Sequence, residues 1–191
     1  MNQMTITIVS GLPRSGTSLL MQMLRAGGME LLTDRHRLPD ENNPRGYFEY
    51  EAVKNISNDN TFLEEARGKA IKIISHLLAY LPERYYYNIL FMRRNIDEVI
   101  LSQNKMLKKL NAPYQEENAE HIKQDFIKHL HKIHIWMRQQ DNVRFLYIDH
   151  RRILNQPHTE AARIVHFLQL DLDTQKMATV IDPSLYRSRI E

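Results

Sequence analysis

The chain has 191 residues, of which 42% are hydrophobic and 26% are charged, a composition typical of a soluble globular protein. This length predicts a single domain over residues 1–191. A net charge of +3 is too small to indicate a nucleic-acid partner. The absence of cysteine excludes disulfides, thiolate metal sites and a cysteine nucleophile.

No run of apolar residues reaches the roughly 18 that a membrane-spanning helix needs. The longest candidates are interrupted by Lys72, His76 or Arg93. The first residues also lack the basic segment and the small-residue cleavage site of a signal peptide. We therefore expect a cytoplasmic protein without a membrane partner.

The first part of the chain predicts a strand, a turn, a helix and a loop in that order. A β-branched run at 5–10 predicts a buried strand, and the glycine-bounded segment 11–16 predicts a turn. Apolar residues at helical spacing predict a helix at 17–26, followed by two glycines that end it. The polar segment 33–46 predicts a loop, and a loop of this length is typical of a binding segment or a lid.

The rest of the chain continues to alternate between strands and helices. In chain order we expect a helix at 49–67, strands at 69–75 and 88–93, helices at 96–110 and 117–138, a strand at 143–149 and a helix at 159–168. Strands separated by helices of this length pair in parallel. The sequence therefore predicts an α/β fold of three layers, with helices flanking a mostly parallel sheet.

The turn after the first strand is the most informative segment. Backbone N–H groups of such a turn and the positive end of the following helix converge on one point, where an anion is stabilised. Gly11 and Gly16 have the spacing of a nucleotide-binding P-loop, and Ser18 stands at its hydroxyl position. Thr17 occupies the lysine position of that loop, and the basic residue is Arg14, within the turn. By itself, this pattern also fits an unrelated anion-binding turn.

The segment 13–18, Pro-Arg-Ser-Gly-Thr-Ser, resembles the 5′-phosphosulfate loop of sulfotransferases. These enzymes take a sulfuryl group from 3′-phosphoadenosine 5′-phosphosulfate (PAPS) and release 3′-phosphoadenosine 5′-phosphate (PAP). The resemblance implies a P-loop-like sulfotransferase fold. It also implies a donor site formed by Arg14, Ser15, Gly16, Thr17 and Ser18, with Arg14 contributing to catalysis.

A second motif follows the strand predicted at 88–93. Arg94 and Ser102 have the separation at which sulfotransferases place an arginine and a serine that bind the 3′-phosphate, and Asn95 matches the Arg-Asn pair. An arginine fork and a hydroxyl suit a phosphate dianion. The alternative is that Arg94 forms an ion pair with Asp97 or Glu98.

The general base is less clearly marked. Cytosolic sulfotransferases end a strand in Lys-Thr-His, with the histidine as the base, and His76 stands in a similar place. The alternative is a partly buried histidine without chemistry. Glu30, Asp40 and Glu41 are the acidic candidates, because tyrosylprotein sulfotransferases use a glutamate in the region after the first helix.

Three further features of the sequence bear on the site. Segment 39–49 resembles an Asn-Pro-x-Gly-Tyr-Phe-Glu stretch of bacterial sulfotransferase-like proteins and predicts either an acceptor pocket or a well-packed turn. Arg187 and Arg189 could close over the 3′-phosphate, as a basic C-terminal segment does in many sulfotransferases. His129, His131 and His134 are interpreted as solvated or packed, because a closed metal site needs three or four convergent ligands.

Together these motifs predict a PAPS-dependent sulfotransferase that transfers a sulfuryl group to a hydroxyl or an amine. Arginine and backbone donors meet the developing charge, so no metal is required. The alternatives are a P-loop kinase that uses ATP and a non-catalytic nucleotide-binding module. The acceptor and the oligomeric state are left open by the sequence.

Overall fold

A parallel β-sheet forms the centre of the computed structural model, which describes residues 5–34, 36, 38–40, 43, 45–109, 119–186, 188 and 190. Within these residues the sheet has four strands in the order β2-β1-β3-β4. The strands are β1 (Thr5–Gly11), β2 (Ala70–Lys72), β3 (Tyr86–Arg93) and β4 (Val143–Asp149). Every neighbouring pair is parallel, which confirms the predicted α/β fold.

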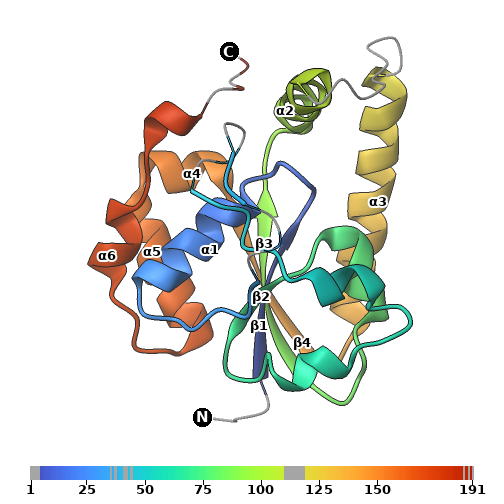
Figure 1. Cartoon of the computed structure of the whole chain (residues 1–191), viewed down its shortest axis with the longest axis vertical. Helices are drawn as coiled ribbons and strands as arrows, with labels where there is room; N and C mark the ends of the chain where they lie inside the picture. Colours follow the sequence, from blue (N-terminus) through green and yellow to red (C-terminus); the bar gives the residue numbers. More distant parts are fainter. Residues whose placement is uncertain are drawn as a thin grey trace.

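Helices cover both faces of this sheet (Figure 1). The helices of the described residues are α1 (Thr17–Ala26), α2 (Ile96–Lys109), α3 (Ala119–Gln139), α4 (His150–Asn155), α5 (Pro157–Leu168) and α6 (Thr174–Thr179), of which α2 lies beyond the end of the strands and covers neither face. One core cluster joins the sheet to α3 and to 3₁₀ turns, and the other joins it to α1, α5 and α6. The molecule therefore has the three predicted layers.

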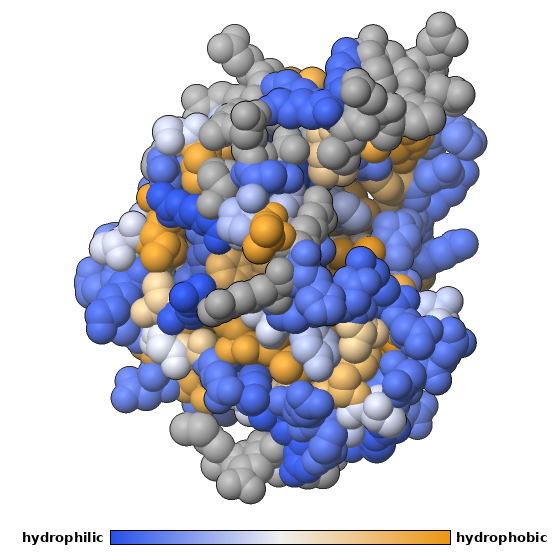
Figure 2. Space-filling view, viewed as in Figure 1, coloured by the Kyte–Doolittle hydropathy of each residue, from blue (hydrophilic) through white to orange (hydrophobic). Residues whose placement is uncertain are grey.

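The core follows from the alternation of side chains along β1. Ile6 and Ile8 belong to the α3 side of the core, whereas Val9 belongs to the α1 side, and all three are fully buried. The strand can be apolar on both faces because helices cover both. On the face shown in Figure 2, hydrophobic residues gather near the middle and polar residues dominate the edges.

The strand order determines where a ligand can bind. The chain passes from β1 to β2 on one side and then returns to place β3 on the other side of β1. In open α/β sheets, ligands bind in the crevice at the carboxyl ends of the strands where the order reverses in this way. The loops after β1 and β3, which carry both predicted motifs, flank that crevice.

The helix predicted over 49–67 is wrong. The structure has two 3₁₀ turns there, Glu51–Asn55 and Thr61–Glu64. Between them, the backbone N–H groups of Asn58 and Asp59 donate to the carbonyl of Asn55, and the Asp59 side chain accepts from the N–H of Thr61. These local bonds compete with a continuous helix, even though apolar residues of the segment are buried.

Other boundaries differ by less. The strand predicted at 69–75 is regular only over Ala70–Lys72, because the chain enters the 3₁₀ turn Ser75–Tyr80 soon afterwards. The short helices α4 and α6 were not predicted. The N-cap of α4 is Asp149, whose side chain accepts from the N–H groups of Arg151 and Arg152. No helix among the described residues is long and apolar enough to cross a membrane.

Candidate active site

The loop between β1 and α1 has the backbone geometry of an anion-binding turn. Gly11, Arg14 and Gly16 all have positive φ, at 147°, 68° and 105°. Residues in the first turn of α1 are not acidic, so no carboxylate competes with an anion there. An anion at this turn would meet the positive end of α1 without an opposing carboxylate from the first turn of the helix.

Gly16 packs directly against His150, the first residue of α4. A Cβ atom at position 16 would lie 2.6 Å from Cδ2 of His150, so only glycine allows this approach. Burial, together with the positive charge of Arg94, lowers the pKa of His150 to about 4. The turn after β1 therefore rests on an imidazole that is neutral near pH 7.

Arg14 brings the two predicted donor-binding motifs together. Its Nε donates to Oγ of Ser102 on α2 at 3.1 Å. Its backbone carbonyl accepts from a terminal nitrogen of Arg94 at 3.2 Å. Arg14, Arg94 and Ser102 therefore meet at the crevice between β1 and β3, although 80 and 88 residues separate Arg14 from the other two.

Arg94 is held by a buried carboxylate. Its Nε donates to Glu98 at 3.0 Å, and the side chain of Glu98 is only 2% exposed. The ion pair considered for Arg94 is thus present, but it lies inside the site rather than on the surface. Burial acts to raise the pKa of Glu98, and hydrogen bonds from Tyr186 and Arg94 outweigh it, so that the pKa lies below its usual value.

The C-terminal segment closes over the same arginine. Tyr186 donates to Glu98, and the guanidinium of Arg94 lies 5.1 Å from the centroid of the Tyr186 ring. Arg94 also donates to the backbone carbonyl of Ser188 at 3.2 Å. Arg187 and Arg189, which we expected near this phosphate, lie outside the described residues.

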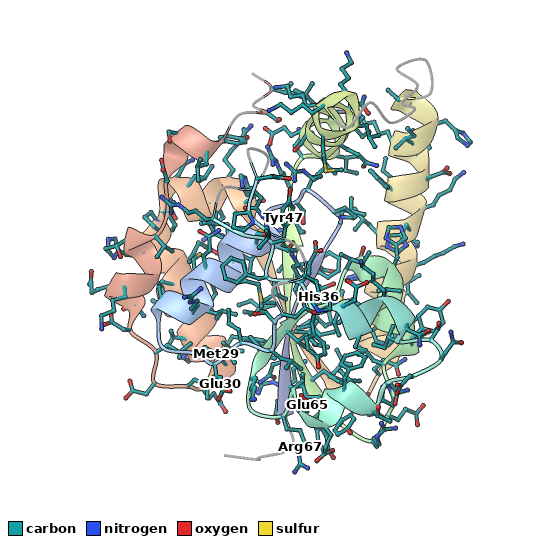
Figure 3. All side chains as sticks on the ribbon, viewed as in Figure 1. Met29, Glu30, His36, Tyr47, Glu65 and Arg67 are labelled. Atoms are coloured by element: carbon teal, nitrogen blue, oxygen red, sulfur yellow. The ribbon has the colours of Figure 1, made fainter. Side chains whose placement is uncertain are left out.

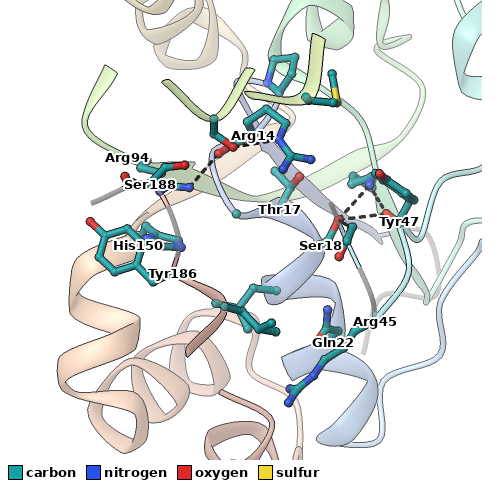
Figure 4. Close-up of a pocket in the computed structure, with 18 of the residues that line it drawn as sticks. Arg14, Thr17, Ser18, Gln22, Arg45, Tyr47, Arg94, His150, Tyr186 and Ser188 are labelled. Carbon is teal, nitrogen blue, oxygen red and sulfur yellow. Dashed lines mark hydrogen bonds between the residues drawn. The ribbon is translucent and has the colours of Figure 1, made fainter. Parts of the chain in front are cut away.

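These groups line a cavity of about 460 Å³ (Figure 4). Its size is in the range of small-molecule sites. The close-up shows Arg14 between Arg94 and Ser188 on one side and Ser18 and Tyr47 on the other. The basic residues of the lining are Arg14, Arg45, Lys72, Arg94, Lys105 and Lys109, and the acidic residues are Glu49 and Asp182. The cavity is therefore suited to an anionic ligand.

Lys72 and Glu49 also line the cavity, and the sequence singled out neither as a donor-binding or catalytic residue, although Glu49 ends the segment 39–49, for which an acceptor pocket was one alternative. Lys72 ends β2 with its side chain 6% exposed, and it donates to the backbone carbonyl of Tyr47. Its Nζ lies 3.4 Å from Oγ of Ser18 and 3.7 Å from a carboxylate oxygen of Glu49. A lone lysine at the end of a buried strand was the available signal. Lys72, at the end of β2, thus places a positive charge beside the loop after β1, in which Thr17 occupies the position of the P-loop lysine.

His76 lies in the 3₁₀ turn after β2 and is not among the residues that line this cavity, whereas Ile74 is. Its ring stacks on that of His129 from α3, with 3.8 Å between centroids. Nε2 of His129 is 2.9 Å from Oγ of Ser75. Burial lowers the pKa of His76, and burial followed by the nearby His76 lowers that of His129 to about 4.

The acidic candidates from the sequence lie apart from one another. Glu30 follows the C-terminal end of α1, away from the labelled Tyr47, and forms an ion pair with Lys69 at 2.9 Å (Figure 3). Asp40 accepts from the hydroxyl of Tyr47 at 2.8 Å, which ties the predicted loop to the cavity wall. Glu41 lies outside the described residues. Among those residues, no cluster of three or more His, Asp or Glu side chains is arranged to hold a metal ion.

The comparisons with known proteins concern the family and the fold of the chain. The sulfotransferase family profile matches residues 47–174, which include the Arg94 motif but not the phosphate loop. A solved sulfotransferase domain from the curacin biosynthetic pathway has a TM-score of 0.53, 15% identity, and a match over 91% of this chain and 76% of that one. At this identity the likeness shows the fold alone. No curated protein sequence matches.

The family match and the α/β fold define a sulfuryl-transferring enzyme. The chain belongs to the sulfotransferase family. The predicted family and fold are both confirmed, and the motifs at 13–18 and 94–102 remain the sequence features that pointed to them.

Proposed function

We propose that this chain is a PAPS-dependent sulfotransferase that transfers the sulfuryl group to a hydroxyl or amine of an acceptor. The main support is the meeting of Arg14 with Arg94 and Ser102 at the carboxyl ends of β1 and β3. This arrangement offers two arginine side chains and a hydroxyl next to a loop of backbone N–H groups. A nucleotide with separate 5′- and 3′-anions suits that distribution of donors.

The residues present fit such a donor. Oγ of Ser15 lies in this loop, is buried, and has no hydrogen-bond partner among the described residues. A Cβ at Gly11 would come within 2.6 Å of that oxygen, so the glycine keeps the loop open around it. We assign the 5′-phosphosulfate to Arg14 and the loop residues Ser15, Gly16, Thr17 and Ser18. The 3′-phosphate is assigned to Arg94 and Ser102.

In the proposed reaction, the acceptor oxygen or nitrogen forms a bond to sulfur while the bond from sulfur to the bridging phosphate oxygen breaks. The electron pair of that bond stays with the PAP product. Arg14 and the loop amides stabilise the leaving phosphate, a preorganised electrostatic effect of the kind that usually dominates catalysis. Lys72, next to Ser18, adds a positive charge on the same side. These donors are sufficient without a metal ion.

The acceptor proton needs a base. Glu49 lines the cavity with its side chain 31% exposed, and its carboxylate lies 3.7 Å from Nζ of Lys72, which is next to Ser18 of the loop assigned to the phosphosulfate. We therefore propose Glu49 as the base, which takes the proton as the new bond to sulfur forms. His76, the base expected from the sequence, is the alternative, and Ile74, two residues before it, lines the same cavity.

The donor can be tested by the melting temperature with PAP, PAPS, ATP with Mg²⁺, and ADP. A ligand at about 100 times its dissociation constant stabilises the folded chain by roughly 2.7 kcal/mol. We expect PAP and PAPS to raise the melting temperature well above the effect of ADP. Stabilisation by ATP with Mg²⁺ but not by PAP would support the kinase instead. Binding of PAP without transfer to any acceptor would support the non-catalytic module.

A second readout separates the enzymatic alternatives. Labelled sulfuryl transfer from PAPS should continue in excess EDTA, since the proposed charges are met by arginine, lysine and backbone donors. A P-loop kinase depends on Mg²⁺ bound to its nucleotide and would lose activity under the same condition.

We further propose that the enzyme acts in the cytoplasm, where its nucleotide donor would be supplied.

A further inference from the structure

The segment that follows β2 contributes to the wall of the cavity. Ile74, the residue before the 3₁₀ turn Ser75–Tyr80, lines the cavity, and so does Lys72 at the end of β2. The backbone at Ile74 is extended, and side chains two residues apart on an extended backbone point to the same side. Ile74 therefore lies beyond Lys72 on the cavity side of this segment.

This part of the cavity is next to the proposed base. Nζ of Lys72 lies 3.7 Å from a carboxylate oxygen of Glu49 and 3.4 Å from Oγ of Ser18, in the loop assigned to the phosphosulfate. An acceptor that gives its proton to Glu49 must lie on this side of the phosphosulfate. Ile74 is an apolar residue at that place, so we expect its side chain to contact the acceptor.

The position of Ile74 depends on how the turn after it is held. The N–H of Ile73 donates to the carbonyl of Val9 on β1 at 3.1 Å, which keeps the segment beside the sheet. The chain then turns, and the N–H of Leu77 donates to the carbonyl of Ile74 at 2.9 Å. Ile74 is thus the joint between the end of the sheet and the turn.

Helix α3 holds the start of this turn. Nε2 of His129 lies 2.9 Å from Oγ of Ser75, which is fully buried. The ring of His129 stacks on that of His76, with 3.8 Å between the centroids and 4° between the planes. Burial is the main cause that lowers the pKa of both rings, so near pH 7 they are uncharged and stack without charge repulsion.

The body of the turn and the helix are each anchored by other residues. Leu78 and Leu81 belong to the core cluster on the α3 side of the sheet. The buried residues of α3 are Ile133 and Met137. His129, one turn before Ile133, therefore adds a directed contact to the start of the turn, and the chain can fold without it.

We propose, on the basis of the proposed function, that His129 is a positioning residue for the acceptor. Through Ser75 and the stacked ring of His76, it holds Ile74 in contact with the acceptor. The acceptor then has an apolar group next to the hydroxyl or amine that receives the sulfuryl group. Loss of His129 weakens acceptor binding and leaves turnover at saturating acceptor within a few-fold of the wild type.

The test measures labelled sulfuryl transfer from PAPS to 2-naphthol and to 2-phenylethylamine, and their binding to the PAP-loaded protein by calorimetry. We expect His129→Ala to raise the KM of at least one of them by about threefold to tenfold, the range of a hydrogen bond. Ile74→Ala should raise it at least as much, and both variants should keep the wild-type affinity for PAP. His131→Ala is the matched control, because His131 is an exposed residue of the same helix, and its KM should equal that of the wild type.

A double variant shows whether His129 acts through Ile74. Ile74→Ala with His129→Ala should raise the KM no more than Ile74→Ala alone, because the effects of coupled residues do not add. His129→Gln, whose amide nitrogen can reach Ser75, should recover part of the affinity lost in His129→Ala. Ser75→Ala removes the same hydrogen bond from the turn and should raise the KM alike, which keeps the test valid if His129→Ala does not fold.

Additive effects in the double variant, an unchanged KM in His129→Ala and Ser75→Ala, or a loss confined to the turnover number would overturn the positioning role. If the wild type binds PAP but neither binds nor sulfates the two acceptors, the apolar contact at Ile74 is overturned while the donor assignment stands. If the wild type fails to bind PAP at all, the proposed function itself fails.

Discussion

Arg14 and Ser102 connect the two nucleotide motifs of this sulfotransferase-family chain through a hydrogen bond of 3.1 Å. Arg14 lies in the loop that follows β1, and Ser102 lies on α2, the helix that follows β3. Because β1 and β3 are adjacent parallel strands, their carboxyl ends place both residues at one crevice.

Removing the charge of Glu98 should weaken nucleotide binding, although Glu98 itself does not contact the nucleotide in the proposed complex. Glu98→Gln takes a buried carboxylate from Arg94 and Tyr186, so the guanidinium loses its fixed orientation. We expect the affinity for PAP to fall by roughly 10-fold, in the range of a hydrogen bond to a charged group. The affinity for AMP, which lacks the 3′-phosphate, should change little. Calorimetry with both nucleotides measures the difference.

Asp97→Asn is the matched control for that variant, because Asp97 is the adjacent residue on the same helix and pairs with Lys123 at 2.8 Å. Its affinity for PAP should equal that of the wild type. Equal losses for PAP and AMP in Glu98→Gln would show that the carboxylate supports the fold rather than the 3′-phosphate contact.

Glu49→Gln should lower the turnover number while leaving PAP affinity within a few-fold of the wild type. Proton abstraction by a positioned base typically contributes 10²–10⁴-fold to the rate. His76→Gln should stay within a few-fold of wild-type turnover, because this ring packs on His129. Labelled transfer at saturating PAPS compares the two variants, and the opposite ranking would identify His76 as the base.

Gly16→Ala should destabilise the chain more than Gly28→Ala. Both glycines have φ near 100°, at 105° and 98°, so both substitutions carry a similar backbone cost. A Cβ at position 16 meets His150 at 2.6 Å, whereas nothing lies within 4 Å of one at position 28. We expect about 1–2 kcal/mol of destabilisation at position 28 from the left-handed backbone, and a larger loss at position 16.

Urea unfolding of the two alanine variants gives this comparison directly. Adding His150→Ala to Gly16→Ala should recover part of the lost stability, since it removes the clashing ring. Equal stabilities of Gly16→Ala and Gly28→Ala would mean that the loop does not rest on His150.

The free energy of unfolding should fall as the pH is lowered from about 6.5 toward 4, in part because of His150. Burial lowers the pKa of this histidine to about 4, so the unfolded chain binds the proton more readily than the folded one. The stabilisation is therefore complete above the unfolded pKa and is lost as the pH falls. A shift of this size corresponds to up to about 3 kcal/mol.

His150→Gln tests this effect because glutamine does not titrate. Denaturant unfolding at pH 7.5 and pH 4.5 should show a larger pH dependence for the wild type than for the variant. His129, whose pKa is also about 4, contributes to both proteins equally and does not obscure the comparison. Identical pH dependences would contradict the placement of His150 as a buried neutral ring.

The phosphate loop and the Arg94 motif could be predicted because each is encoded by neighbouring residues. A buried strand, a turn and a helix follow one another within residues 5–26, and the spacing of Gly11 and Gly16 fixes the turn between them. The structure adds that β1 and β3 are adjacent and parallel, which brings the two motifs together. The family and the order of the layers follow from these local patterns.

The contact that Lys72 and Glu49 make beside Ser18 could not be predicted, because it depends on tertiary packing. They are distant in sequence from Ser18, and only the position of β2 beside β1 brings Lys72 next to that hydroxyl. The helix expected at 49–67 does not form, and the reason is local. Apolar spacing favoured it, but hydrogen bonds of Asn55 and Asp59 turn the chain twice within that segment.

The most direct test of the central claim is calorimetric titration of PAP into the wild type, Arg14→Ala and Arg94→Ala. The account predicts that the wild type binds PAP in the absence of Mg²⁺ and that each variant binds it roughly 10- to 100-fold more weakly, the range for a hydrogen bond to a charged group. Wild-type affinity for PAP in both folded variants would contradict the assignment of these arginines to the sulfuryl donor.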